Sequence, residues 1–431
     1  MKPNSLLGLC LSAILLLAAS CSPELQPLPE WNQFRGPTGL GISAEVNLPE
    51  TWNIDGTNVR WVTDLQGLGN SSPIVSQGRV FLTAASDDPE APKNALREVF
   101  AYDLETGVLQ WKIPLESTPK EKVHFLSTLA PATPVADENH LWVYIGSHLA
   151  KLDHEGQVLW KKEVDPDYWR TTRYGVGSSP VLVAGLVVLF QDQESSRLKD
   201  RGWLAAFDQD TGEEKWRHEW THTCCSYATP LVYDDGEILQ ILVPFSGEVA
   251  SYVAETGERL WSHPYKIHQI VPSLALEGDL LCATGGGHSV NGTACLRLTG
   301  SGRDTTAETL WTTPRLPATM ASPVLYNGRL YVLTQKGVLV QYDPETGAIQ
   351  WQQRLSRGMC QSSLVAGDDK IYAVSRRGPV AVVAAQDELQ LIAENMLDGG
   401  LNSTPAIADG CLLLRAKKRL FCVANPRSET P

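Results

Sequence analysis

The segment AYDLETGVLQW, residues 101–111, is the most informative part of the sequence because close copies of it recur. It returns as AFDQDTGEEKW at residues 206–216 and as QYDPETGAIQW at residues 341–351, and weaker copies end at Trp160 and Trp261. An apolar strand, an Asp, a Thr-Gly turn and a second strand that carries Trp are typical of a β-hairpin whose turn needs a residue with positive φ. The repeat therefore predicts a protein built from many similar hairpins.

A second phrase lies upstream of these hairpins: a small or hydroxyl residue, then Pro, then an apolar strand. It occurs eight times if two degenerate copies, Pro272-Ser273 and Ser362-Ser363, are included. The six regular copies are Ser72-Pro73, Thr133-Pro134, Ser179-Pro180, Thr229-Pro230, Ser322-Pro323 and Thr404-Pro405. The Trp sites also give eight when Leu391 is counted in the eighth place, so two independent landmarks agree. We expect these Trp residues to be structural docking groups: Trp61, Trp111, Trp160, Trp216, Trp261, Trp311 and Trp351.

Each unit is expected to form four antiparallel strands. Residues 58–424 divided by eight units give about 46 residues per unit, which is the period of a propeller blade. The chain enters on the strand of Trp61 with no inner strands before it, and it leaves after Val423 with no Trp strand following. The first strand should therefore complete the last blade and close the ring, which removes exposed sheet edges. The prediction is an all-β protein, a single eight-bladed β-propeller with four antiparallel strands per blade.

The N-terminus has the features of an export signal. One lysine precedes an apolar run from Leu6 to Leu17, which is too short to span a bilayer as a helix and has the length of a signal-peptide core. The run ends in small residues before Cys21, which resembles a bacterial lipobox with Cys21 as the lipidated residue. An ordinary signal peptide with a small-residue cleavage site is the alternative. In either case the folded part is expected outside the cytoplasm.

The predicted organisation follows from these features. It is a signal peptide at 1–20, a lipid-attached linker at 21–30, an extended segment packed on the propeller at 31–57, the propeller at 58–424 and a tail at 425–431.

The composition excludes nucleic acid as a partner. The chain has 36 Lys and Arg against 49 Asp and Glu, and its net charge is −13. Without a basic stripe, the chain has no electrostatic footprint for nucleic acid.

The nine cysteines suggest disulfides rather than a metal site, since no paired CxxC spacing is present. Two pairs are placed for cross-strand bridges, Cys282–Cys295 and Cys411–Cys422, although neither bridge is required. Cys224 and Cys225 are adjacent, and Cα atoms about 3.8 Å apart are closer than the usual disulfide separation of about 4.4–6.8 Å. A bond between them would be strained and easily reduced; two thiols in a half-buried loop, or bonds to other cysteines, are the alternatives.

Binding groups of a propeller sit on loops at the ends of the inner strands, around the mouth of the channel. In this sequence those loops directly precede the eight Pro phrases. Any single polar residue there is also consistent with ordinary loop polarity, but together they mark the expected ligand face. The candidate rim residues are His124, Arg173, Tyr174, Tyr227, His268 and Asn402.

The hairpin phrase resembles the tryptophan-docking repeat of the PQQ-like (pyrroloquinoline quinone) eight-bladed propellers, and WNQFRGP at residues 31–37 resembles the opening of exported bacterial members. The resemblance covers residues 31–424. This superfamily includes quinoprotein dehydrogenases, which hold PQQ and calcium, and the outer-membrane assembly lipoprotein BamB, which binds no cofactor. The resemblance therefore implies the fold, and it leaves the chemistry open.

Two functions remain. One is a non-catalytic, BamB-like scaffold: a monomeric lipoprotein facing the periplasm, at the outer membrane in preference to the inner, that binds a protein partner or ligand through its rim. The other is a PQQ-dependent dehydrogenase of alcohols or sugars, in which Cys224 and Cys225 would lie against PQQ. The rim lacks an Asp or Glu that matches the calcium and catalytic carboxylates of those enzymes, which are also commonly longer and carry the Cys pair nearer the start of the propeller. We therefore expect no catalytic residue, no metal site and no cofactor.

Overall fold

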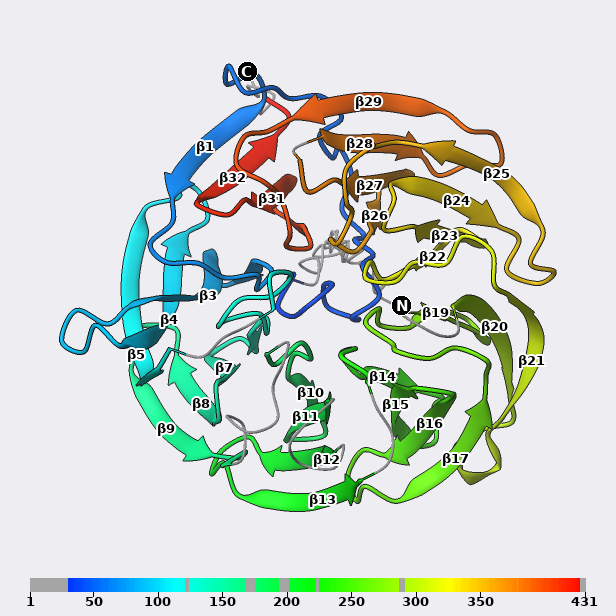
Figure 1. Cartoon of the computed structure of the whole chain (residues 1–431), viewed down its shortest axis with the longest axis horizontal. Helices are drawn as coiled ribbons and strands as arrows, with labels where there is room; N and C mark the ends of the chain where they lie inside the picture. Colours follow the sequence, from blue (N-terminus) through cyan, green and yellow to red (C-terminus); the bar gives the residue numbers. More distant parts are fainter. Residues whose placement is uncertain are drawn as a thin grey trace, which may run out of the picture.

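The computed structural model describes residues 30–120, 124–166, 175–193, 201–221, 225–286, 291–377 and 379–426. Within these ranges the chain forms eight four-stranded antiparallel sheets, arranged as blades around a central axis (Figure 1). The same ranges contain one helical element, the 3₁₀ turn η1 (Gly302–Asp304), and none of their helices has the length and apolar character needed to cross a membrane. The predicted all-β, eight-bladed propeller is confirmed.

We number the blades along the chain, and each is given from its innermost to its outermost strand. Blades 1–4 are β2 (Ile74–Ser76), β3 (Arg79–Asp87), β4 (Asn94–Asp103), β5 (Leu109–Pro119); β6 (Val135–Ala136), β7 (His140–Ile145), β8 (His148–Asp153), β9 (Val158–Glu163); β10 (Val181–Val183), β11 (Leu186–Gln193), β12 (Arg201–Asp208), β13 (Glu214–Trp220); and β14 (Leu231–Asp234), β15 (Leu239–Phe245), β16 (Glu248–Val253), β17 (Arg259–Pro264). Blades 5–8 are β18 (Ala275–Glu277), β19 (Leu280–Gly285), β20 (Gly292–Thr299), β21 (Thr306–Thr313); β22 (Val324–Tyr326), β23 (Arg329–Leu333), β24 (Val338–Tyr342), β25 (Ile349–Arg354); β26 (Val365–Gly367), β27 (Lys370–Val374), β28 (Pro379–Ala384), β29 (Leu391–Met396); and β30 (Ala406–Ala408), β31 (Cys411–Arg415), β32 (Arg419–Ala424), β1 (Val59–Asp64).

The Thr-Gly phrase forms the turn between the third and fourth strands of a blade. In blade 1 the carboxylate of Asp103 accepts hydrogen bonds from the amide of Thr106 at 2.8 Å and from its hydroxyl at 2.7 Å. Gly107 follows with φ +69°, a conformation that glycine adopts without steric cost, and its amide donates to the carbonyl of Asp103. Each residue of the phrase therefore has a role in turning the chain.

The ring closes as the phase of the repeats predicts. The first strand, β1, is the outermost strand of blade 8 and pairs antiparallel with the last strand, β32, with Trp61 opposite Cys422 and Thr63 opposite Leu420. The two ends of the propeller therefore lie side by side in one sheet (Figure 1). This arrangement removes an open edge between the first and last blades.

An inner belt of hydrogen bonds links all eight blades around the channel. In each blade the Ser or Thr before the first strand, which we call the belt residue, accepts a hydrogen bond from the belt amide of the preceding blade. The donor–acceptor distances lie between 2.9 and 3.1 Å, and the last bond runs from Thr404 back to Ser72. The belt residues are Ser72, Thr133, Ser179, Thr229, Ser273, Ser322, Ser363 and Thr404.

An outer set of contacts joins the blades at the perimeter, where Trp from one blade docks on the Thr-Gly turn of the next. The Trp61 ring, for example, lies on Gly107 and its Nε1–H donates to the Leu104 carbonyl at 2.9 Å. Trp111, Trp160, Trp216 and Trp311 dock in the same way, each donating to a carbonyl of the following blade. Trp261 and Trp351 do not: Trp261 donates to Gln240 of its own blade, and Trp351 Nε1 is buried with no hydrogen-bond partner among the residues that the structure describes.

The cysteines follow the sheet register. Cys282 and Cys295 face each other on β19 and β20 and are joined by a disulfide. The second expected pair is not bonded, since Cys411 and Cys422 are free, buried thiols. The pairing of β31 with β32 places Cys411 opposite Ala424 and Cys422 opposite Leu413, so the turn is centred one residue later than the symmetric hairpin we assumed.

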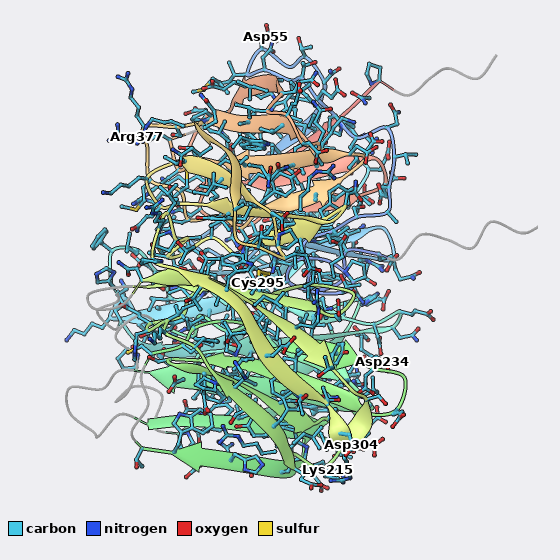
Figure 2. All side chains as sticks on the ribbon, turned by 90° about the vertical axis from the view of Figure 1, so that its right-hand side faces the viewer. Asp55, Lys215, Asp234, Cys295, Asp304 and Arg377 are labelled. Carbon is cyan, nitrogen blue, oxygen red and sulfur yellow. A yellow bond between two sulfur atoms is a disulfide. The ribbon has the colours of Figure 1, made fainter. Side chains whose placement is uncertain are left out.

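Residues 30–58 form an extended arm that lies across one mouth of the channel, which we call the lower mouth. Its carbonyls at Trp31 and Asn32 accept hydrogen bonds from the amides of Val75 and Ala136 at 2.8 Å, in blades 1 and 2. It then crosses the mouth and pairs in parallel with β26 of blade 7 through Ile42. Figure 2 shows the ring edge-on, with its axis across the view: Asp234 lies to the right, on the face of the lower mouth, and Arg377 lies to the left, on the opposite face, which we call the upper face. Cys21 and the expected signal peptide lie outside the described residues.

Candidate functional site

The channel holds a small cavity of about 150 Å³ with a repeated wall. Every blade contributes its belt residue and the residue two positions before it. The second set comprises Asn70, Pro131, Gly177, Tyr227, Val271, Met320, Gln361 and Asn402. Phe34 of the arm closes the cavity on the side of the lower mouth, and Leu126 completes the lining. In this second set the polar side chains come from blades 1, 4, 7 and 8, so a wall with an eightfold backbone carries an asymmetric set of side chains.

Two predicted rim residues, Tyr227 and Asn402, belong to this wall. The Asn402 side-chain oxygen is buried and has no hydrogen-bond partner in the described part of the chain. The side-chain oxygen of Gln361 is in the same state, and our sequence analysis missed this residue. Counting two positions back from each belt residue would have found it. The cavity therefore presents two buried acceptors that suit hydrogen-bond donors such as water.

His124 and His268, two further predicted rim residues, do not line the cavity. The His124 ring packs at a tilt of 40° against the Phe125 ring with centroids 4.4 Å apart, and the Phe125 side chain is 72% exposed. His268 lies within 3.2 Å of the Ser246 hydroxyl, with the donor set by the histidine tautomer. Arg173, Tyr174 and Cys224 lie outside the described residues. Cys225 is buried and disulfide-bonded.

The described cavity wall does not fit pyrroloquinoline quinone with calcium. PQQ carries three carboxylates, which proteins bind with Arg, Lys or a metal ion. None of the residues described around the cavity carries a formal charge. Over the described ranges, no three His, Cys, Asp or Glu side chains gather where they could hold a metal ion, whereas calcium requires several oxygen ligands and usually carboxylates. The uncharged polar side chains of the described cavity wall therefore suit neutral, hydrogen-bonding molecules.

The arm is fixed at the lower mouth by a buried arginine. Arg35 is fully buried and has φ +65°. Its guanidinium donates to the carbonyl of Leu274 at 3.0 Å and to that of Leu40 at 2.7 Å, and also bonds the carbonyl of Pro323. Burial without a carboxylate lowers the pKa of Arg35 to about 9. The FRG part of the opening motif therefore pins the arm to blades 5 and 6, with Phe34 against the channel.

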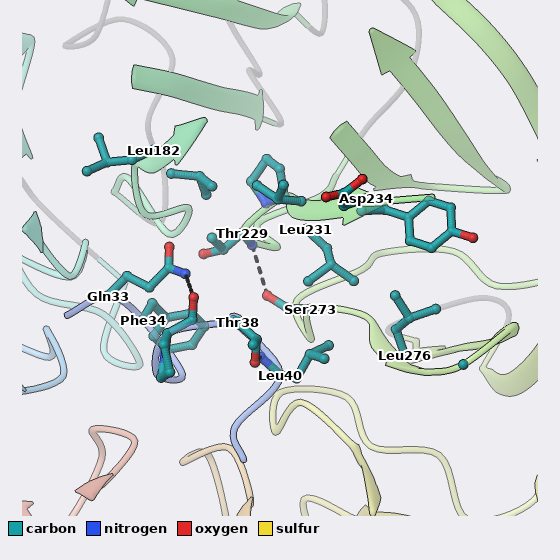
Figure 3. Close-up of a pocket in the computed structure, with 17 residues that line it drawn as sticks. Gln33, Phe34, Thr38, Leu40, Leu182, Thr229, Leu231, Asp234, Ser273 and Leu276 are labelled. Carbon is teal, nitrogen blue, oxygen red and sulfur yellow. Dashed lines mark hydrogen bonds between the residues drawn. The ribbon is translucent and has the colours of Figure 1, made fainter. Parts of the chain in front are cut away.

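A groove of about 430 Å³ lies beside the arm at the lower mouth, between the arm and the inner strands of blades 3, 4 and 5 (Figure 3). Its wall is largely apolar, with Leu182, Leu231 and Leu276 facing Phe34 and Leu40 of the arm. The sequence analysis did not anticipate this groove, because its two walls come from segments that are distant in the chain.

One end of the groove is acidic. Asp234 lines it, is exposed, and pairs with no cation among the described residues. Partial burial opposes ionisation of its neighbour Asp235, but hydrogen bonds from the amides of Ile238, Glu237 and Gly302 lower the pKa of Asp235 to about 2. Asp235 is therefore ionised at neutral pH. The groove thus combines an apolar wall with negative charge at one end.

The channel and the groove together have the features of a binding surface. Neither lining contains Ser, Cys or Thr next to a histidine, nor a pair of carboxylates, in the residues that the structure describes. Such pairs are a common arrangement in nucleophilic and acid–base catalysis. The described linings can exclude water and hold an apolar or hydrogen-bonding partner.

Comparison with known proteins gives one family and one widespread fold. The sequence matches the family described as "Outer membrane protein assembly factor BamB" over residues 50–167, 97–305 and 299–401. A curated relative with that name, from Shewanella oneidensis, is 24% identical over 245 residues, which cover 52% of this chain and 57% of the relative. The match therefore spans little more than half of that relative's length.

Solved structures share the fold at low sequence identity. A quinohemoprotein alcohol dehydrogenase, ADHIIG, from Pseudomonas putida HK5 matches with a TM-score of 0.64 at 13% identity, over 93% of this chain and 82% of the enzyme. The quinohemoprotein alcohol dehydrogenase from Comamonas testosteroni matches with a TM-score of 0.65 at 11% identity, over 94% and 82%. These likenesses establish the propeller architecture and carry no information on activity.

Proposed function

We propose, from the premise that this chain belongs to the family described as outer membrane protein assembly factor BamB, that it is an exported, non-catalytic scaffold propeller that binds protein partners at a membrane. The observation that carries this proposal is the uncharged wall of the channel. A quinone with three carboxylates would need cations that the described wall lacks. A scaffold needs only a rigid ring with accessible mouths.

The proposal includes attachment by lipid at Cys21, a monomeric chain and a position facing the periplasm, at the outer membrane in preference to the inner. The lipobox-like sequence before Cys21 supports the anchor, and the family name supports the outer membrane. The exposed Phe125, next to the cavity-lining Leu126, supports a contact surface for protein, because aromatic side chains are enriched at interfaces.

The second candidate is a PQQ-dependent dehydrogenase of alcohols or sugars. The observation in its favour is that Cys225, one member of the adjacent pair Cys224-Cys225, is disulfide-bonded. The alcohol dehydrogenases of similar fold share 11–13% identity with this chain, which is too low to transfer a cofactor site. We therefore rank this candidate below the scaffold.

Membrane anchoring is tested by Cys21→Ser with Cys10→Ser as the matched control in the apolar run. We expect Cys21→Ser to move the chain from the membrane to the soluble envelope fraction, because one acylated cysteine supplies the anchor. Cys10→Ser should leave it on the membrane. A chain that stays membrane-bound after Cys21→Ser contradicts the lipid anchor.

Partner binding is tested by mild crosslinking in cells followed by purification of a tagged chain. The scaffold proposal expects one or more envelope proteins at fixed stoichiometry, retained after Cys21→Ser if the contact is through the propeller. Recovery of the chain alone under all crosslinking conditions would contradict a scaffold function.

A further inference from the structure

The way in which the arm binds the innermost strands indicates what kind of ligand the groove at the lower mouth could bind. The arm binds the blades through backbone groups at their innermost strands, as described above for blades 1 and 2. The amides that donate to the arm belong to Val75 and Ala136, and each is the third residue after its belt residue. The same position in blade 7, Ala366, donates to the Gly41 carbonyl at 2.7 Å and accepts from the Ser43 amide at 2.8 Å. The arm thus adds to inner sheet edges as an extended strand.

Blades 3 and 4 offer the same positions without the arm. The third residues after their belt residues are Leu182 and Val232, and both line the groove. Among the described residues, no arm carbonyl accepts a hydrogen bond from either amide. The arm leaves blade 2 at Asn32 and reaches blades 5 and 6 through Arg35, so it passes across the mouth without covering this sector (Figures 1 and 3).

The Leu182 amide points into the groove for a geometric reason. Leu182 pairs with Val187 just as Val75 pairs with Val80. Each is the second residue pair from a two-residue turn, next to the pair that flanks the turn. In such a hairpin the second pair from the turn is not hydrogen-bonded across the strands, so its amide and carbonyl face the open edge. The amide of Val75 uses that direction to reach the arm. Leu182 therefore offers a free edge at the same place.

We propose that this groove binds an extended peptide segment of a partner protein, with apolar side chains against Leu182, Leu231 and Leu276 and a basic side chain near Asp234. Two consecutive peptide carbonyls would repeat at Leu182 and Val232 what Trp31 and Asn32 do at blades 1 and 2. Edge addition supplies affinity through the backbone, and the leucine wall selects side chains. The inference names the partner chemistry of the proposed scaffold and rests on that function.

Charge complementarity selects a basic peptide. Asp234 stands at the groove end, and the carboxylates of Asp235 and Asp279 lie close enough to Tyr233 to add to the rise in its pKa that burial causes. Asp279 is paired with Arg297 at 3.1 Å, whereas Asp234 and Asp235 have no cationic partner among the described residues. A lysine or arginine beside the apolar part of the peptide would meet this charge.

The test uses fluorescence polarisation with a labelled hexapeptide of sequence KTWVTV. We expect saturable one-to-one binding with a dissociation constant below about 1 mM. The same peptide N-methylated at alternate residues should bind at least about tenfold more weakly, because the methyl groups keep its backbone from approaching the open edges closely enough for its carbonyls to accept these hydrogen bonds. Hydrogen exchange should slow at the amides of Leu182 and Val232 when the unmodified peptide is bound.

Charge reversal gives the matched variants. Asp234→Lys should weaken binding by about fivefold, the size expected for an exposed charge contact. Glu388→Lys changes an exposed carboxylate between β28 and β29, outside the groove lining, and should change the affinity by less than about twofold. Both positions are exposed, so folding should be retained in both variants.

Three results would overturn the inference: no saturable binding of the peptide, binding without protection at Leu182 and Val232, or equal effects of the two charge reversals. A dimer that Asp234→Lys dissociates would assign the groove to a second copy and also overturn it. If the peptide fails while envelope proteins still copurify with the tagged chain, the groove assignment falls and the scaffold function stands. If the peptide does not bind and no envelope protein copurifies, both the groove assignment and the scaffold function are contradicted.

Discussion

The inner belt and the outer tryptophan ring connect the same eight blades, yet they differ in completeness. At the inner radius every interface carries the same hydrogen bond, including the closing one between Thr404 and Ser72. At the outer radius five interfaces have a docked Trp, and three do not: those that follow blades 4, 6 and 7, where Trp261, Trp351 and Leu391 stand.

This difference indicates that closure is set at the channel. A belt residue is buried with its amide and hydroxyl committed to two neighbours, so any missing member leaves a buried group without a partner. An outer Trp lies at the partly exposed perimeter and contacts one neighbour, so a missing Trp removes one local contact. The ring tolerates loss at the perimeter and retains every member of the belt.

The largest effect is expected where a side chain would enter a Trp dock. Gly257→Ala places a Cβ 2.6 Å from the Trp216 ring at φ +73°, whereas Gly185→Ala has the same φ and open space around it. We expect Gly257→Ala to lower the free energy of unfolding by about 2–4 kcal/mol and Gly185→Ala by about 1 kcal/mol. Urea unfolding measures both. Equal losses would show that docking contributes nothing beyond backbone strain.

The belt is tested by two adjacent serines. The Ser363 hydroxyl accepts a hydrogen bond from the Ser322 amide at 3.0 Å, whereas the buried hydroxyl of Ser362 has no partner in the described part of the chain. Ser363→Ala should cost about 1–3 kcal/mol because it leaves a buried amide unpaired, and Ser362→Ala should be nearly neutral. The comparison uses thermal unfolding monitored by circular dichroism. A neutral Ser363→Ala would mean that the belt does not stabilise closure.

The smallest difference is expected between two tryptophans at the perimeter. Trp111 donates to the His154 carbonyl at 2.9 Å, and Trp351 donates to nothing among the described residues. Replacement by Phe removes similar ring area in both, so Trp111→Phe should lose about 1 kcal/mol more stability than Trp351→Phe. Denaturant unfolding of the two variants gives this difference directly. The opposite order would contradict the docking role of the indole N–H.

The fold could be predicted from the sequence because its determinants are local. Asp103, Thr106 and Gly107 form one turn within five residues, and the Pro phrases and Trp sites that accompany its copies give the number of blades. For the belt, the sequence shows only the repeated Ser/Thr-Pro phrase and not the hydrogen bonds. Those bonds join residues 41 to 61 positions apart along the chain, and 332 positions apart at closure. The Cys411–Cys422 bridge, which the sequence left open, is not formed, because the register of a hairpin depends on turn geometry and a shift of one residue moves every pairing.

The candidate site could be predicted only in part. Loop position placed Tyr227 and Asn402 at the channel, because the loop before each inner strand must face the axis. Phe34 and Arg35 were visible as a motif, but their role depends on contacts with blades 5 and 6, up to 288 residues away. The groove beside the arm has no local sequence signal at all. Its walls meet only after the ring has closed.

The central claim is that the channel of this propeller is structural and that the chain acts by binding protein. It is tested most directly by titrating the purified chain with PQQ in the presence of calcium, following cofactor absorbance and dye reduction with an alcohol. We expect no saturable uptake and no turnover, because the described channel wall has no charged group to hold the quinone. Uptake of one PQQ per chain with alcohol-dependent dye reduction would contradict the account.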